Sequence, residues 1–162
     1  MNTGSRRILV VDDDPASCEL VAYFLKSLGY QVAIAADGPR ALNMDLDDDI
    51  ELVILDAHMP KYDGVEVLAM IRERPRAEAV KVLALTGDNS IQVREAMERT
   101  GIDGFLTKPV DLAALREEVV RLMPGPAQRQ TILRRRIHQA GADGVPHAPA
   151  ADPRAGLRRE GT

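Results

Sequence analysis

The chain has little that points to aromatic stacking, disulfide bonding or membrane insertion. It contains no tryptophan and only 3% aromatic residues, which argues against stacking on bases or sugars as its main mode of recognition. Its single cysteine, Cys18, excludes an intrachain disulfide and a thiolate metal cluster, and it fits a reducing compartment. No apolar run approaches the roughly 20 residues that span a bilayer, and the N-terminus lacks the pattern of a secretory signal. We therefore expect a cytoplasmic protein that has no membrane-spanning segment.

Charge is distributed unevenly along the 162 residues. Residues 1–123 carry 22 acidic and 14 basic side chains, a net charge of −8, whereas residues 124–162 carry 3 and 7, a net charge of +4. The second segment is rich in proline, glycine and alanine, so it cannot bury enough apolar surface to offset chain entropy. We expect a domain at 6–123 and a mostly disordered tail or linker at 124–162, in which only 128–140 could form a marginal helix. Whether an output domain follows residue 162 stays open.

Within the first segment, short apolar runs alternate with helical patterns. The runs are continuous rather than alternating in polarity, which predicts strands that are covered on both faces. They lie at 8–11, 32–36, 52–55, 82–85 and 105–106. The helices between and after them are marked by caps, prolines and terminal glycines. They are predicted from Asp14-Pro15 to Gly29, over 39–45, across 65–71 up to Pro75, from Ser90 to Gly101 and from Asp111 onward.

Five strand-then-helix units with short connections predict an α/β protein with a five-stranded parallel sheet and helices on both faces. A length of about 120 residues suits the flavodoxin-like strand order 2-1-3-4-5. In that order a binding site forms at the carboxyl ends of the first and third strands, where the winding of the sheet reverses. This placement tells us where to look for chemistry.

Acidic residues gather at these two strand ends. Asp12, Asp13 and Asp14 follow the first strand, and Asp56 follows the third. Converging carboxylates repel one another unless a proton or a cation intervenes, and Mg²⁺ suits such a site because it binds one or two carboxylates and keeps waters or phosphate oxygens. Asp14 is fully explained as the N-cap of the first helix.

The fourth and fifth strands end in a hydroxyl and an ammonium group, on Thr86 and Lys108. Together with the carboxylates they form a set that handles phosphoryl groups. In such a set a metal ion and a cation neutralise the equatorial oxygens while a carboxylate attacks phosphorus. A carboxylate nucleophile yields an aspartyl phosphate.

Four sequence stretches carry a family resemblance. They are ILVVDDD at 8–14, LVILDAHMPKYDG at 52–64, VLALTGD at 82–88 and GFLTKP at 104–109. In order and spacing they resemble the signature stretches of the response-regulator receiver domain of two-component signalling, in particular its single-domain, chemotaxis-regulator-like form. The resemblance covers roughly 6–123. It implies a phosphoprotein that acts as a signalling switch and is not an enzyme, beyond catalysing its own phosphorylation and dephosphorylation.

The resemblance also implies the roles of the acidic residues. Asp56 is then the phosphoacceptor and also a Mg²⁺ ligand. Asp13 is expected to bind Mg²⁺ directly, whereas Asp12 acts largely through water. The backbone carbonyl of His58 completes the protein ligands, and its side chain, together with Asp88, should influence how readily water attacks the acyl phosphate.

Three further residues take their roles from the same resemblance. Thr86 and Lys108 each contact a phosphoryl oxygen, and Phe105 is the aromatic switch that turns inward when the threonine moves. The expected donor is a sensor histidine kinase or a histidine phosphotransfer protein, and small acyl phosphates are also donors. The output is contact with an unknown downstream protein through the surface of 90–123, by a monomer or a weak, phosphorylation-linked dimer.

Two other functions stay open at the level of sequence. The Asp12-Asp13-Asp14 run is similar to that of haloacid-dehalogenase-type phosphatases, in which Asp12 would be the nucleophile and Asp14 the general acid. That alternative leaves Asp56 unexplained, and the length has no room for a cap domain. The other is a receiver-like adaptor that is never phosphorylated. Nucleic-acid binding is not expected, because the arginine runs near the C-terminus are better explained as solubilising charge.

Overall fold

The computed structural model describes residues 6–44, 50–87 and 90–125. The predictions for Asp88, for the helix at 128–140 and for the tail from residue 126 onward lie outside them. The elements, in chain order, are β1 (Arg7–Val11), α1 (Pro15–Ser27), β2 (Gln31–Ala35), α2 (Gly38–Asn43), β3 (Ile50–Asp56), α3 (Gly64–Arg72), β4 (Lys81–Thr86), α4 (Ile91–Thr100), β5 (Gly104–Thr107) and α5 (Leu112–Leu122). None of the helices among the described residues combines the length and the apolar character needed to cross a bilayer.

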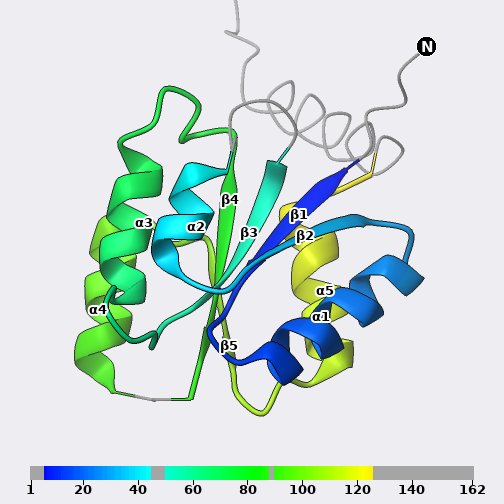
Figure 1. The fold of residues 1–162 in the computed structure, drawn as a ribbon. Helices are drawn as coiled ribbons and strands as arrows, with labels where there is room; N and C mark the ends of the chain where they lie inside the picture. Colours follow the sequence, from blue (N-terminus) through cyan, green and yellow to red (C-terminus); the bar gives the residue numbers. More distant parts are fainter. Residues whose placement is uncertain (1–5, 45–49, 88–89, 126–162) are drawn as a thin grey trace, which may run out of the picture. The chain divides into compact units, whose positions relative to one another are not determined.

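The five strands form one sheet in the order β2-β1-β3-β4-β5, and every pair of neighbours is parallel. This is the predicted flavodoxin-like order. Helices α2, α3 and α4 cover one face of the sheet, while α1 and α5 cover the other (Figure 1). The winding therefore reverses between β1 and β3, and the carboxyl ends of these two strands meet at one edge of the sheet.

A hydrophobic cluster fills the space on each face of the sheet. Because side chains alternate along a strand, Leu9 and Val11 of β1 join the cluster under α2, α3 and α4, whereas Ile8 and Val10 join the one under α1 and α5. The prediction of strands covered on both faces holds for the interior strands β1, β3 and β4. It is wrong for the edge strands, since β2 is only partly buried, with Ile34 43% exposed, and β5 is half-buried.

The helix ends agree with the predicted caps, with one difference. Asp14 accepts hydrogen bonds from two backbone N–H groups at the start of α1, and Asp111 does the same for α5. Ser90 occupies the N-cap position of α4, but its side chain makes no capping hydrogen bond. Gly101 ends α4 with φ 98°, a left-handed conformation that glycine adopts without steric cost.

Candidate functional site

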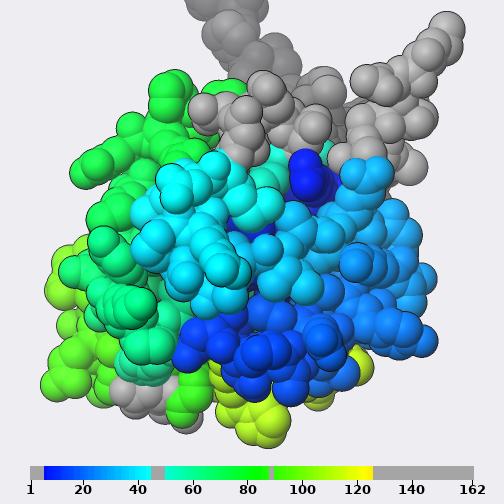
Figure 2. Space-filling model, in the orientation of Figure 1, coloured from blue at the N-terminus to red at the C-terminus, as the bar shows by residue number. Residues whose placement is uncertain are grey.

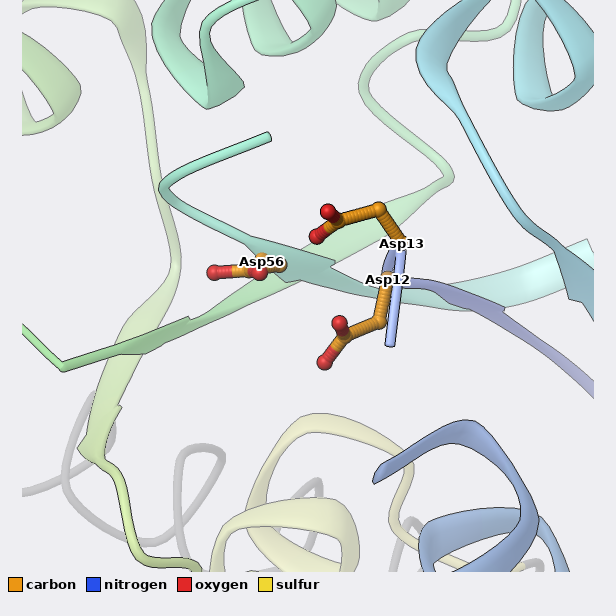
Figure 3. A group of neighbouring side chains, drawn as sticks. All are labelled: Asp12, Asp13 and Asp56. Atoms are coloured by element: carbon orange, nitrogen blue, oxygen red, sulfur yellow. The ribbon is translucent and has the colours of Figure 1, made fainter. Parts of the chain in front are cut away.

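Three carboxylates converge where β1 and β3 end. Asp12 and Asp13 directly follow β1, and Asp56 is the last residue of the neighbouring strand β3. Each offers one oxygen atom, and these oxygens all lie within 4.8 Å of one another. Figure 3 shows the three carboxylate groups turned toward the same side of the strand ends. The structure thus brings together acids that are 43 residues apart in the chain.

Asp12 is the most buried of these acids, with an exposed fraction of 2%. Its Oδ1 accepts a hydrogen bond from the backbone N–H of Asp14 at 2.9 Å, and its Oδ2 accepts one from the hydroxyl of Ser17 at 2.8 Å. Burial by itself would raise the pKa of Asp12, but hydrogen bonds from Lys108, Asp14 and Ser17 outweigh it, so the pKa lies below its ordinary value. Asp12 is therefore held in its ionised form.

Lys108 supplies the positive charge of the site. Its Nζ lies 2.8 Å from Oδ2 of Asp12 and 3.1 Å from Oδ2 of Asp56. The lysine directly follows β5, and its backbone N–H donates to the carbonyl of Thr86 at 2.8 Å, which fixes its position beside β4. Burial would lower the pKa of Lys108, but the two carboxylates more than offset this and raise it. The side chain remains an ammonium ion.

Asp56 is held by a donor on each of its oxygens. The backbone N–H of His58 donates to Oδ1 at 3.0 Å, and Lys108 lies against Oδ2. Burial raises the pKa of Asp56, and these two donors offset the increase only in part. An oriented and partly desolvated carboxylate beside an ammonium group is well placed to meet an electrophilic phosphorus atom.

Thr86 and Phe105 lie on the neighbouring strands. Thr86 is buried at the end of β4, one residue past Leu85, which pairs with Asp56 in the sheet. Thr86 and Phe105 both line a cleft of about 280 Å³ between β4, α4 and β5. On α4, the guanidinium of Arg94 lies over the ring of Phe105, 4.9 Å from its centroid.

Gly64 lets α3 begin directly against the strand that carries Asp56. A Cβ atom on this residue would lie 2.7 Å from the carbonyl oxygen of Asp56 and 2.8 Å from Cα of Ala57, both shorter than atoms tolerate. The preceding Asp63 caps the helix by accepting from the N–H of Val65. In the DG pair that ends the 52–64 stretch, the aspartate thus caps α3, and the glycine allows the helix to start in close contact with the backbone of β3.

Sequence reasoning missed two residues of this region. The hydroxyl of Ser17 donates a hydrogen bond to Oδ2 of Asp12, and no motif marks this serine, although it lies on the first turn of the helix that follows the acidic run. Arg94 contacts Phe105 from another element, and only the packing of α4 on β5 reveals the contact. Asp14 acts as the predicted cap through bonds to Ala16 and Ser17, and nothing in the site supports the phosphatase alternative.

The donor set fits a hard divalent cation. Three carboxylates face one ammonium group, which leaves an excess of negative charge in a small volume. All the offered side-chain ligands are oxygens, which is the preference of Mg²⁺, and one carboxylate is exposed and can reach an ion that keeps its waters. The site can therefore hold a metal ion, and the residues present are compatible with magnesium.

Fold and site together define an α/β protein with an acidic cluster that suits a cation, at the switch point of a parallel sheet. The chain belongs to the response regulator receiver domain family, whose model matches residues 8–120. It is 37% identical over 125 residues to the response regulator MprA of Mycolicibacterium vanbaalenii, which covers 77% of this chain and 52% of that protein. The chain spans about half the length of the curated regulators that it matches.

Solved receiver structures agree with the fold. The chemotaxis protein CheY4 of Vibrio cholerae superposes with a TM-score of 0.69 at 28% identity, covering 73% of this chain and 98% of that one. The receiver domain of the sensor histidine kinase PA1611 of Pseudomonas aeruginosa gives 0.68 at 28% identity, covering 75% and 99%. The latter structure has a magnesium ion coordinated in its active-site cleft. Receiver domains are generally signalling modules rather than enzymes.

Proposed function

We propose that this protein is a phosphorylation-dependent switch that accepts a phosphoryl group on Asp56 and signals by protein–protein contact. The observation that carries the proposal is the position of the Asp56 carboxylate. It is buried, held by Lys108 at 3.1 Å, and grouped with Asp12 and Asp13 within 4.8 Å. The membership of the chain in a family of two-component signalling modules supports the same function.

In the proposed step an oxygen of Asp56 attacks the phosphorus of a phosphohistidine on a sensor kinase or a phosphotransfer protein. The new bond joins this oxygen to phosphorus, and the bond from phosphorus to the imidazole nitrogen breaks, so that the nitrogen keeps the electron pair. Mg²⁺, held by Asp12, Asp13, Asp56 and the backbone carbonyl of His58, would neutralise charge on the phosphoryl oxygens when bound. His58 N–H and Lys108 keep the Asp56 carboxylate oriented during the attack.

The remaining residues stabilise and read the new group. Lys108 pairs with one phosphoryl oxygen and the hydroxyl of Thr86 with another. Phe105 responds to the movement of Thr86 by turning toward it, which changes the surface formed by α4, β5 and α5. The shared cleft beside Thr86 and Phe105 supports this assignment, because it leaves room for the ring to move. A downstream protein binds the changed surface.

The extent of the switch and its setting are parts of the same proposal. We assign the receiver domain to 6–123 and a tail or linker to 124–162, supported by the family match at 8–120 and by the end of α5 at Leu122. We place the protein in the cytoplasm, as a monomer or a weak dimer that forms on phosphorylation.

Intact-mass measurement tests the proposal. The protein is incubated with Mg²⁺ and acetyl phosphate, and one phosphoryl group is expected to add to the wild-type chain. No addition is expected with EDTA or in Asp56→Asn, which keeps the shape of the side chain and loses the nucleophile. Asp14→Asn is the matched control, since it neutralises an adjacent acid whose role is to cap α1, and it should be phosphorylated normally.

Two outcomes would contradict the proposal. A wild-type protein that stays unmodified by acetyl phosphate and by a panel of histidine kinases would favour a receiver-like adaptor that is never phosphorylated. Addition that persists in Asp56→Asn would place the acceptor elsewhere.

A further inference from the structure

The ring of Phe105 is held between two different environments. On one side it packs against the buried cluster under α2, α3 and α4. The guanidinium of Arg94 lies over the ring at 4.9 Å from its centroid, within the distance at which a cation is attracted to an aromatic face. The side chain of Arg94 is 65% exposed, so this attraction is partly screened by water.

Arg94 is itself paired along its own helix. Its Nε lies 3.2 Å from Oε1 of Glu98, one turn further on α4. This spacing orients the guanidinium along the helix surface, above the strand that carries Phe105. The second ion pair of α4, between Arg99 and Glu95 at 3.9 Å, has the same chemistry and spacing, but neither residue lines the cleft beside Phe105.

The proposed switch requires a second position of the ring, turned toward Thr86. The cleft that Phe105 and Arg94 line together with Thr86 has a volume of about 280 Å³. A cavity of about 150 Å³ is enough to hold a benzene molecule. The guanidinium lies over the ring in its present position. We expect a turn of the ring toward Thr86 to break this contact, so that the cation stabilises the present position alone.

We propose that Arg94 acts as a latch on Phe105. The guanidinium of Arg94 holds the ring in its present position and so sets the population of the switched ring position before phosphorylation. This inference rests on the proposed role of Phe105. A latch of this kind keeps the unphosphorylated protein inactive, since a cation that binds only one of two conformations shifts the population toward that conformation. Phosphorylation then has to offset the free energy of the contact between Arg94 and Phe105 before the ring can turn.

The test follows the ring directly. The chain has two phenylalanines, Phe24 and Phe105, so ¹³C-ring-labelled phenylalanine gives two sets of NMR signals, which Phe24→Leu assigns. In unphosphorylated Arg94→Met, the Phe105 signals are expected to move toward their positions in phosphorylated wild-type protein. Loss of an exposed cation–π contact predicts a change of about two- to five-fold in the ratio of the two ring positions.

Two variants separate the cation from other effects. Arg94→Lys keeps a charge over the ring and should stay closer to wild type than Arg94→Met does. Arg99→Met removes the matched arginine from the same helix and should leave the Phe105 signals unchanged. If Lys behaves as Met does, or if Arg99→Met gives the same shift, then the latch is wrong.

The latch and the proposed function fail in different ways. Mass measurement on the same samples reports whether Asp56 gains a phosphoryl group, and its absence in wild-type protein would overturn the proposed function. If the group adds but the Phe105 signals do not move on phosphorylation, or do not differ between wild type and Arg94→Met, the latch is overturned and the acceptor site stands.

Discussion

Two clusters of charged side chains lie at opposite ends of the strands, and they differ in how their charges are balanced. At the carboxyl ends of the strands, Asp12, Asp13 and Asp56 share a single ammonium group, that of Lys108. The excess of acid destabilises the cluster as it stands, because like charges close together repel. A cation that binds in the cluster therefore reduces this repulsion and stabilises the protein.

At the amino ends of the strands, one carboxylate is surrounded by donors. Oδ2 of Asp103 accepts from Nη2 of Arg72 at 2.7 Å and from the backbone N–H of Val82 at 2.9 Å, and Oδ1 accepts from Lys81 at 3.1 Å. Arg72 also donates to the carbonyls of Gly101, Ala77 and Val80. This network ties the end of α3 and the start of β4 to the loop before β5.

The difference between the two clusters distinguishes a binding site from a network that stabilises the fold. In the Asp103 network two cations and one backbone N–H surround a single carboxylate, so its negative charge is balanced without a bound ion. The acidic cluster has an excess of negative charge, which suits it to bind a cation.

The largest expected effect is the loss of the Asp103 network. Asp103→Ala should lower the free energy of unfolding by about 2–4 kcal/mol, since it leaves partly buried cations and a strand N–H without their acceptor. Urea unfolding followed by circular dichroism measures it. Glu98→Gln, which breaks an exposed pair, should cost less than about 0.5 kcal/mol. Equal costs in the two variants would remove the distinction.

Adding a cation should stabilise the acidic cluster. At a Mg²⁺ concentration ten times the dissociation constant, the free energy of unfolding should rise by about 1.4 kcal/mol, which thermal unfolding detects. Asp13→Asn should lose most of this gain, because it removes a carboxylate of the cluster. Asp14→Asn should keep it, and an equal loss in both variants would point to nonspecific screening.

Neutralising Asp56 should stabilise the protein in the absence of metal. In EDTA at pH 7, Asp56→Asn should raise the free energy of unfolding by about 1 kcal/mol, because it removes a buried charge from an excess of like charges. The amide oxygen can still accept from the N–H of His58. Paired urea titrations of variant and wild type measure the difference, and a destabilised variant would show that the charge of Asp56 supports the fold.

The smallest effect is the dependence of that difference on pH. The pKa of Asp56 is raised in the folded state by burial, so the folded protein holds this proton more tightly than the unfolded chain does. As the pH rises from the ordinary aspartate value of about 3.9 through the raised pKa, wild-type protein loses stability and Asp56→Asn does not lose this part. The gap between them should open over this interval and then stay constant. A gap that closes with rising pH would reverse the sign of the shift.

The parts of the molecule that sequence predicts are those that local rules determine. Continuous apolar runs and capping residues locate the strands and helices, and the parallel order places Asp12, Asp13, Asp56 and Lys108 at one edge because the strand ends must meet there. The family resemblance then adds roles to those positions. This is why the meeting of these four side chains was predictable, whereas their roles in phosphoryl transfer stay predictions.

Side-chain contacts between elements were not predictable in the same way. Arg72 and Asp103 lie 31 residues apart, and arginine at a helix end has many partners within its reach. The position of Arg94 over Phe105 depends on how α4 packs on β5. The partial exposure of β2 follows from its place at the edge, which the apolar pattern of its residues does not reveal.

Cys18 is the only thiol in the chain, and it lies beneath the acidic cluster with its Sγ 3.3 Å from the carbonyl oxygen of Asp12. Burial raises its pKa to about 11, and its exposed fraction is 3%. A thiol reagent such as Ellman's can therefore react only when α1 lifts from the sheet. The rate of thiol modification then measures the opening of α1 in the unlabelled protein. It should decrease when a cation binds at the end of the strand above the sulfur.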